Sequence, residues 1–131
     1  MIVDSSAVLA IILNESDAQR YKIALAAAES RHITSPNWLE VALVIESRAD
    51  ENLRDGFESL FAAFDVTIAP FLPRHAVEAR RAWQRFGRGR HPAKLNYGDC
   101  MAYAFAKAEG RPLLFKGNDF ALTDIEPALK D

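Results

Sequence analysis

The chain has 131 residues, of which 50% are apolar and 26% are charged. This composition is typical of a globular protein and excludes a disordered chain, a collagen or a disulfide-stapled miniprotein, while the length predicts a single domain over residues 1–131. The formal charge of −2 by itself argues against a nucleic-acid partner.

Short apolar strands alternate with longer helices along the chain. The first strand ends at Asp4, and Ser5 or Ser6 can cap the helix that follows. Ser35 and Pro36 supply the N-cap and the first-turn proline of a later helix. We expect strands at 2–3, 32–34, 66–69 and 112–115, and helices at 7–13, 17–29, 36–48, 51–64, 74–86 and 97–108. This alternation predicts an α/β fold whose short parallel central sheet is covered by helices on both faces, a three-layer α/β/α sandwich.

Carboxylates follow several of these strands. Asp4 ends the first strand, Glu40 lies in the helix after the second, and Asp119 follows the fourth. Asp99 lies in the first turn of the helix before that last strand, so it can join them. Open α/β sheets place their sites beyond the carboxyl ends of the strands. Carboxylates gathered there repel one another unless a cation is bound, and an all-oxygen set favours Mg²⁺ or Mn²⁺ over zinc.

Some of these acids also have a purely structural interpretation. Asp4 can cap the first helix, and Asn96 with Asp99 has the spacing of a capping box. Asp119 and the nearby Asp124 lie in a segment typical of turns. The metal-site hypothesis therefore depends on convergence of the acids in space.

Glu40 is less easily explained by capping. With Ser35 as the N-cap it lies beyond the capping turn, and the residues three and four positions later are Leu43 and Val44. We expect Glu40 to lie on an apolar stripe of the helix, where an unpaired carboxylate is costly.

Four segments, in order, resemble those of a known family: IVDSSA at 2–7, SPNWLE at 35–40, GRHPAKLNYGDC at 89–100 and LLFKGNDF at 113–120, with TDI at 123–125 continuing the last. The sequence resembles PIN-domain ribonucleases of the VapC type, the toxin half of bacterial toxin–antitoxin pairs. The resemblance extends over essentially the whole chain.

The resemblance implies a PIN-like fold and a metal-dependent endoribonuclease. Its acidic catalytic and metal site would consist of Asp4, Glu40, Asp99 and Asp119, with Asp124 as an alternative fourth acid. Mg²⁺ is the expected cofactor and Mn²⁺ a substitute, since one or two ions would orient and activate a water for attack on RNA. The expected partners are an RNA substrate, a VapB-like antitoxin and a second copy of the chain in a homodimer.

The charge distribution supports an RNA substrate. Residues 74–94 contain seven basic residues and one acid, a net +6, which leaves −8 for the rest of the chain. Arginines recur there at helical spacing before a loop that leads to Asp99. We expect Arg85, Arg88 and Arg90 to bind the RNA backbone and Ser6 to lie near the scissile phosphate. The alternative for the basic segment is a solvated helix face, or one that pairs with acids of a partner chain.

Other side chains in this part of the sequence are expected to be structural. Trp83 and Phe86 are predicted to pack in the core, and Cys100 to be a small buried side chain. His75 and His91 are predicted at the surface. Because a lone cysteine forms no internal disulfide, and neither a signal peptide nor a membrane span is predicted, we expect a cytoplasmic protein.

Two other classes of function fit parts of the pattern. A haloacid-dehalogenase-like phosphatase also has an aspartate after its first strand, but its motif requires a second acid two residues later, where this chain has Ser6. A non-catalytic protein-binding module, with structural acids, is the second alternative.

Overall fold

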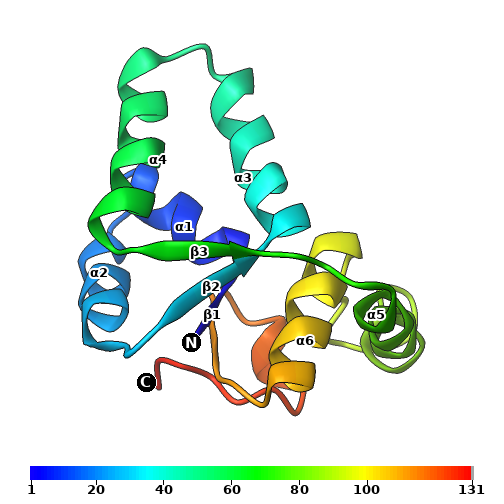
Figure 1. Ribbon diagram of the computed structural model, residues 1–131. Helices are drawn as coiled ribbons and strands as arrows, with labels where there is room; N and C mark the ends of the chain where they lie inside the picture. The colour runs from blue at the N-terminus through cyan, green and yellow to red at the C-terminus, as the bar shows by residue number, and fades with distance from the viewer. Residues whose placement is uncertain (131) are drawn as a thin grey trace.

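A computed structural model describes residues 1–130, and its centre is a four-stranded, entirely parallel sheet (Figure 1). The strand order is β3-β2-β1-β4, so that β1 lies between β2 and β4. In the register, Ile2 is paired with both His32 and Leu113. The strands are β1 (Ile2–Val3), β2 (Arg31–Thr34), β3 (Val66–Ala69) and β4 (Leu113–Leu114).

Every predicted strand and helix is present, with ends displaced by at most two residues. The helices are α1 (Ser5–Ile12), α2 (Ala18–Ala27), α3 (Ser35–Ser47), α4 (Glu51–Ala63), α5 (Pro73–Phe86) and α6 (Tyr97–Glu109), and a short 3-10 helix η1 (Phe120–Leu122) follows β4. None of the helices in residues 1–130 has the length and apolar content needed to span a bilayer.

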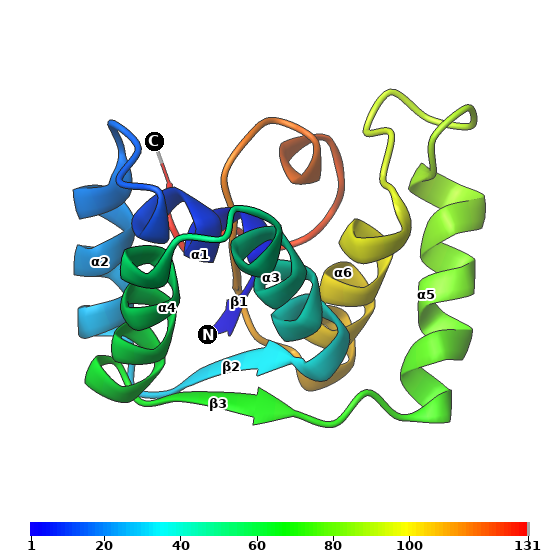
Figure 2. The ribbon, with the colours of Figure 1, turned by 90° about the horizontal axis from the view of Figure 1, so that it is seen from above.

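Helices cover both faces of the sheet, which confirms the predicted three-layer α/β/α class. Successive strand residues point to opposite faces, so Ile2 and Leu113 pack with α5 and α6, whereas Val3 and Leu114 pack with α1 to α4. All four side chains are buried, as expected for a parallel sheet covered on both sides. Figure 2 shows α1 to α4 grouped on one side and α5 and α6 on the other.

The N-cap of α1 is one of the residues that the sequence analysis named, whereas the N-cap of α3 differs from the prediction. Asp4, rather than a serine, is the N-cap of α1, and its carboxylate accepts a hydrogen bond from the Ser6 amide. Thr34, rather than Ser35, is the N-cap of α3, and its hydroxyl accepts from the Asn37 amide at 3.0 Å. Asp4 directly follows β1, and Thr34 is the last residue of β2, so each helix begins where a strand ends. The strand ends therefore fix the directions of these two helices.

The surface position predicted for His75 is wrong, because this ring is 1% exposed. His75 Nδ1 accepts the Leu72 amide hydrogen at 2.9 Å, and the ring packs against Phe71 and Phe105. It therefore anchors the start of α5 against α6. The predicted burial of Cys100 is confirmed.

Phe86 is buried as predicted, whereas Trp83, one turn earlier in α5, remains 37% exposed. The two residues are neighbours on the helix surface, at positions i and i+3, but only Phe86 belongs to the core cluster. Phe86 packs against the Tyr103 ring of α6, which accounts for its burial.

Candidate active site

Asp4 occupies the point where β1 passes into α1, and it is only 3% exposed. Its Oδ2 accepts hydrogen bonds from the Ser6 amide at 3.0 Å and the Ser6 hydroxyl at 2.5 Å. Burial raises the pKa of Asp4 from 3.8 to about 7, and the charges of Asp99 and Glu40 act in the same direction against the Ser6 hydrogen bonds. The buried carboxyl group therefore lies in the field of two other acids.

Glu40 reaches the same region from the second turn of α3. Its carboxylate accepts a hydrogen bond from the Ser5 hydroxyl and lies 3.4 Å from Asn37 Nδ2. Because Ser5 adjoins Asp4, this contact ties the second acid to the first. The Glu40 carboxylate also lies against Gly98, the residue immediately before Asp99.

The apolar stripe of α3 on which Glu40 is predicted to lie does not face the core. The core-facing stripe of α3 consists of Asn37, Val41 and Ile45, one position away from Glu40. Glu40 itself is exposed, and Leu43 is 60% exposed. The carboxylate is held by polar groups at the edge of the sheet rather than by apolar surroundings.

Asp99 is the third residue of α6 and forms the predicted capping box with Asn96. The Asn96 amide donates to Asp99 Oδ2 at 3.0 Å, and the Asp99 amide donates to the Asn96 side chain at 2.9 Å. Burial raises the pKa of Asp99, and the charges of Asp119 and Glu40 add to this, whereas Arg88 opposes it. Capping therefore occupies one oxygen of Asp99, and the charge of Asp99 still raises the pKa of Asp4.

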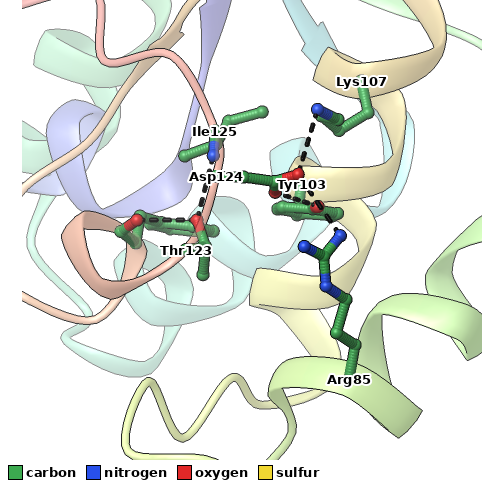
Figure 3. Close-up of polar contacts among 7 residues, drawn as sticks. Arg85, Tyr103, Lys107, Thr123, Asp124 and Ile125 are labelled. Atoms are coloured by element: carbon green, nitrogen blue, oxygen red, sulfur yellow. Dashed lines mark hydrogen bonds and ion pairs between the residues drawn. The ribbon is translucent and has the colours of Figure 1, made fainter.

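The two candidates for the fourth acid have different surroundings. Asp119 is exposed on the turn before η1, and its charge raises the pKa of Asp99. Asp124 instead accepts hydrogen bonds from the Tyr103 hydroxyl and, at 3.3 Å each, from Arg85 and Lys107 (Figure 3).

Partial burial alone would raise the pKa of Asp124, but these hydrogen bonds and positive charges bring it below its usual value. Asp124 is thus a charge-compensated structural group. Of the two, Asp119 is the one whose charge acts on Asp99.

The loop after β4, which carries Asp119, is attached to the start of α1 through Lys116. The Lys116 amide donates to the Ser6 hydroxyl at 2.9 Å, and its Nζ lies 2.6 Å from Glu15 and 3.0 Å from Asp17. The Ser6 hydroxyl is therefore bonded to Asp4 on one side and to the loop on the other. These two bonds orient the Asp4 carboxylate.

The basic residues of the sequence prediction fall into two groups. Arg85 is paired with Asp124, and its guanidinium lies 4.6 Å from the centre of the Phe86 ring. Arg88 is close enough to Asp99 to lower its pKa, and Arg90 is exposed on the loop between α5 and α6. That loop and the η1 segment project from the same side of the molecule (Figure 2).

Sequence reasoning did not identify Ser5, Asn37, Gly98 or Lys116, which hold the acids in place. Asn37 carried a usable signal. It begins the buried i, i+4, i+8 stripe of α3, so a polar side chain there required a partner in the interior. The side-chain amide of Asn37 donates to the Gly98 carbonyl oxygen at 3.1 Å, and this bond links α3 to α6.

The four acids suit a hard divalent cation in their chemistry. All supply oxygen, and within residues 1–130 none of them takes part in a salt bridge that would compensate its charge. They are not closed into a cage, because no three His, Cys, Asp or Glu side chains of the described chain stand together closely enough to hold an ion by themselves. The donor set fits Mg²⁺ or Mn²⁺ with part of the coordination supplied by water.

Comparison with known proteins connects this geometry to a family. The PIN domain model matches residues 1–126. Ribonuclease VapC28 of Mycobacterium tuberculosis is 42% identical over 130 residues, which cover 98% of each chain. Ribonuclease VapC of Mycolicibacterium smegmatis is 42% identical over 125 residues, covering 95% of this chain and 97% of the relative.

Among solved structures, the crystal structure of Mycobacterium tuberculosis VapC20, described as a sarcin-ricin loop cleaving toxin, has a similar fold. Its TM-score is 0.71 at 12% identity, with 96% of this chain and 98% of that chain covered. The family match, the relatives and the shared fold agree. The chain belongs to the PIN-domain family and, within it, to the VapC ribonucleases.

Proposed function

We propose that this protein is a Mg²⁺-dependent endoribonuclease, the toxic component of a type II toxin–antitoxin pair. The observation that carries the proposal is the group of acids around Asp4, a buried carboxyl group whose pKa is raised to about 7 in part by Asp99 and Glu40. A protein gains nothing in stability from such a group by itself. A cation bound at this edge of the sheet would stabilise the charged form of Asp4 and could act on a phosphodiester. The 42% identical relatives are named ribonucleases.

Asp4 and Asp99 would hold the metal ion directly, and Glu40 and Asp119 directly or through water. When bound, Mg²⁺, or Mn²⁺ in its place, neutralises the growing negative charge of the phosphodiester and activates a water for in-line attack. Ser6 keeps the Asp4 carboxylate in its orientation through the hydrogen bond to Oδ2. No serine or cysteine nucleophile is required.

The substrate would approach over the loop between α5 and α6. Arg88 and Arg90 are exposed there, beside the acids, and would bind backbone phosphates on either side of the scissile one. Arg85 has a second role in this proposal, because its pairing with Asp124 fastens the C-terminal segment to α5. A substrate phosphate would compete with Asp124 for this guanidinium.

The proposed protein partners are a VapB-like antitoxin and a second copy of the chain. Apolar side chains are exposed on α3, where Leu39 and Leu43 are 49% and 60% accessible, and at the start of α6, where Tyr97 is 82% accessible. Apolar surface of this kind is typical of protein interfaces. The proposed cytoplasmic location accords with such an intracellular pair.

Cleavage of RNA by the purified chain, freed of antitoxin, tests the proposed activity. We expect cleavage with Mg²⁺, none with EDTA, and loss of cleavage to background in Asp4→Ala and Asp99→Ala. Glu58→Gln, which changes an exposed acid on α4, is the matched control and should cleave as the wild type does. Cleavage that persists in EDTA, or wild-type rates in both alanine variants, would contradict the proposal.

Two alternatives from the sequence are not favoured. The phosphatase hypothesis lacks its second acid, because Ser6 stands there and its hydroxyl donates to Asp4. A purely structural role does not explain why Asp4 and Asp99 lie in the field of other acids, Glu40 and Asp119 among them, with no salt bridge to any of the four in residues 1–130.

A further inference from the structure

We propose that Gly98 is a positioning residue, whose missing side chain leaves the space in which the Glu40 carboxylate lies against the first turn of α6. This inference rests on the proposed function, in which Glu40 belongs to the acidic site. It assigns to the glycine a role in the activity that is separate from any role in folding.

The space at Gly98 is filled by Glu40. A Cβ added to Gly98 would lie 2.3 Å from Glu40 Oε2, 2.8 Å from Oε1 and 2.9 Å from Cδ, so the whole carboxylate faces the glycine. Gly98 is buried and lies within α6, and it is not among the residues with positive φ. Its backbone conformation suits any residue, whereas a helical glycine is less stable than alanine. The close approach of Glu40 accounts for glycine here.

Polar groups hold the Glu40 carboxylate beside Gly98. Asn37 Nδ2 lies 3.4 Å from Glu40 Oε1, and it also donates to the Gly98 carbonyl oxygen at 3.1 Å. The Asn37 side-chain oxygen accepts from the Thr34 hydroxyl at 2.5 Å, and the Ser5 hydroxyl contacts both the Asn37 carbonyl oxygen and Glu40. The carboxylate thus sits between α1, α3 and α6. Because the carboxylate is confined by these contacts, a methyl group at position 98 would force it out of its present position.

The displaced group is the end of a flexible side chain. Glu40 is exposed along part of its length, so its carboxylate can swing toward solvent without moving the backbone. Alanine at position 98 should therefore preserve the fold and gain helix propensity while it disturbs the acidic site. This separation of stability from activity is what makes the proposal testable.

The first experiment compares Gly98→Ala with Gly56→Ala. Gly56 lies in the middle of α4, is exposed, and has no atom within 4 Å of an added Cβ, so it reproduces the helix-propensity gain without the contact. We expect both variants to have a Tm no lower than that of the wild type. Cleavage of RNA should fall about 10- to 100-fold in Gly98→Ala, since a misplaced group costs a factor of this order, and should be unchanged in Gly56→Ala. Wild-type cleavage by Gly98→Ala would overturn the inference.

A second experiment asks whether Gly98 acts through Glu40. The affinity for Mn²⁺, measured by electron paramagnetic resonance, and the Tm are compared for Gly98→Ala in the wild-type and Glu40→Ala backgrounds. Weaker Mn²⁺ binding is expected from Gly98→Ala in the wild type, with no further change in Glu40→Ala, where no carboxylate is left to displace. An equal loss in both backgrounds would overturn the inference. If Gly98→Ala unfolds the protein, refolding in the Glu40→Ala background supports it and unfolding there refutes it.

The two proposals fail in different ways. A wild-type protein that does not cleave RNA refutes the proposed function, while the Mn²⁺ and Tm comparisons still decide the role of Gly98. A wild-type protein that cleaves RNA only with Mg²⁺, together with a fully active Gly98→Ala, refutes only the inference on Gly98.

Discussion

Replacement of Asp4 by asparagine should make the metal-free protein more stable at pH 8 and inactive. Asparagine has nearly the same shape, and its side-chain oxygen can still accept the hydrogen bonds from the Ser6 amide and hydroxyl. What the substitution removes is the charge that Asp4 carries in a site where it is 3% exposed and faces Asp99 and Glu40.

The magnitude follows from the pKa of Asp4, which is raised from 3.8 to about 7. At about 1.36 kcal/mol per pKa unit, ionisation of Asp4 in the folded protein costs up to about 4 kcal/mol more than in the unfolded chain. Because the folded-state pKa is the higher one, the stabilising contribution is fully present below pH 3.8 and is lost as the pH rises through about 7. The advantage of Asp4→Asn should therefore be near zero at pH 4 and largest above pH 7.

Urea unfolding in EDTA at a series of pH values from 4 to 8 measures this difference. An advantage of about 4 kcal/mol at pH 8 corresponds to a Tm higher by roughly 10 °C or more for a chain of this size. Addition of Mn²⁺ should then raise the Tm of the wild type and leave that of Asp4→Asn unchanged, because ligand binding stabilises only the protein that binds. Equal stabilities at pH 8, or an advantage that is greatest at pH 4, would refute the reasoning.

Three further predictions concern the surroundings of the site. Asp119→Asn should reduce RNA cleavage at least about 10-fold without lowering the Tm. Asp124→Asn should lower the free energy of unfolding in urea by about 1–3 kcal/mol and leave the cleavage rate unchanged. The reverse pattern would exchange the roles of the two residues. His75→Ala removes a buried ring and the acceptor at the start of α5, and should cost about 3 kcal/mol in the free energy of unfolding; an unchanged midpoint would contradict its anchoring role. Arg88→Gln should raise KM for RNA and make KM less dependent on salt concentration than it is in the control Arg48→Gln, which changes an exposed residue at the far end of α3. Equal salt dependence in the two variants would exclude a phosphate contact by Arg88.

The fold was predictable because each local signal agreed with the next. Short apolar pairs such as Leu113 and Leu114 are buried on both faces of a parallel sheet, and helices of suitable length separate them. The helix starts were less predictable, since Thr34 and Ser35 are both good N-caps and the choice depends on where β2 ends. His75 was assigned to the surface because its neighbours in sequence are basic, but burial is decided by the helix face that meets α6.

The acids of the proposed site stand out in the sequence, whereas the groups that contact them do not. Asp4 and Asp99 are recognisable because each follows a strand end or begins a helix, a position visible in the chain itself. The contacts of Glu40 with Ser5 and Gly98 join residues separated by 35 and 58 positions. Such pairings depend on the packing of α3 between α1 and α6. No local pattern contains that information.

Capping and metal binding, which competed as explanations of the acids in the sequence, are compatible in the structure. Ser6 bonds one oxygen of Asp4, and Asn96 bonds one oxygen of Asp99. These bonds fix the direction of each carboxylate, but a neutral donor leaves the negative charge in place. A salt bridge would have fixed the direction and also cancelled the charge that a cation requires. The local hydrogen bonds that make these aspartates helix caps therefore also orient them without cancelling the charge that the proposed metal ion would require.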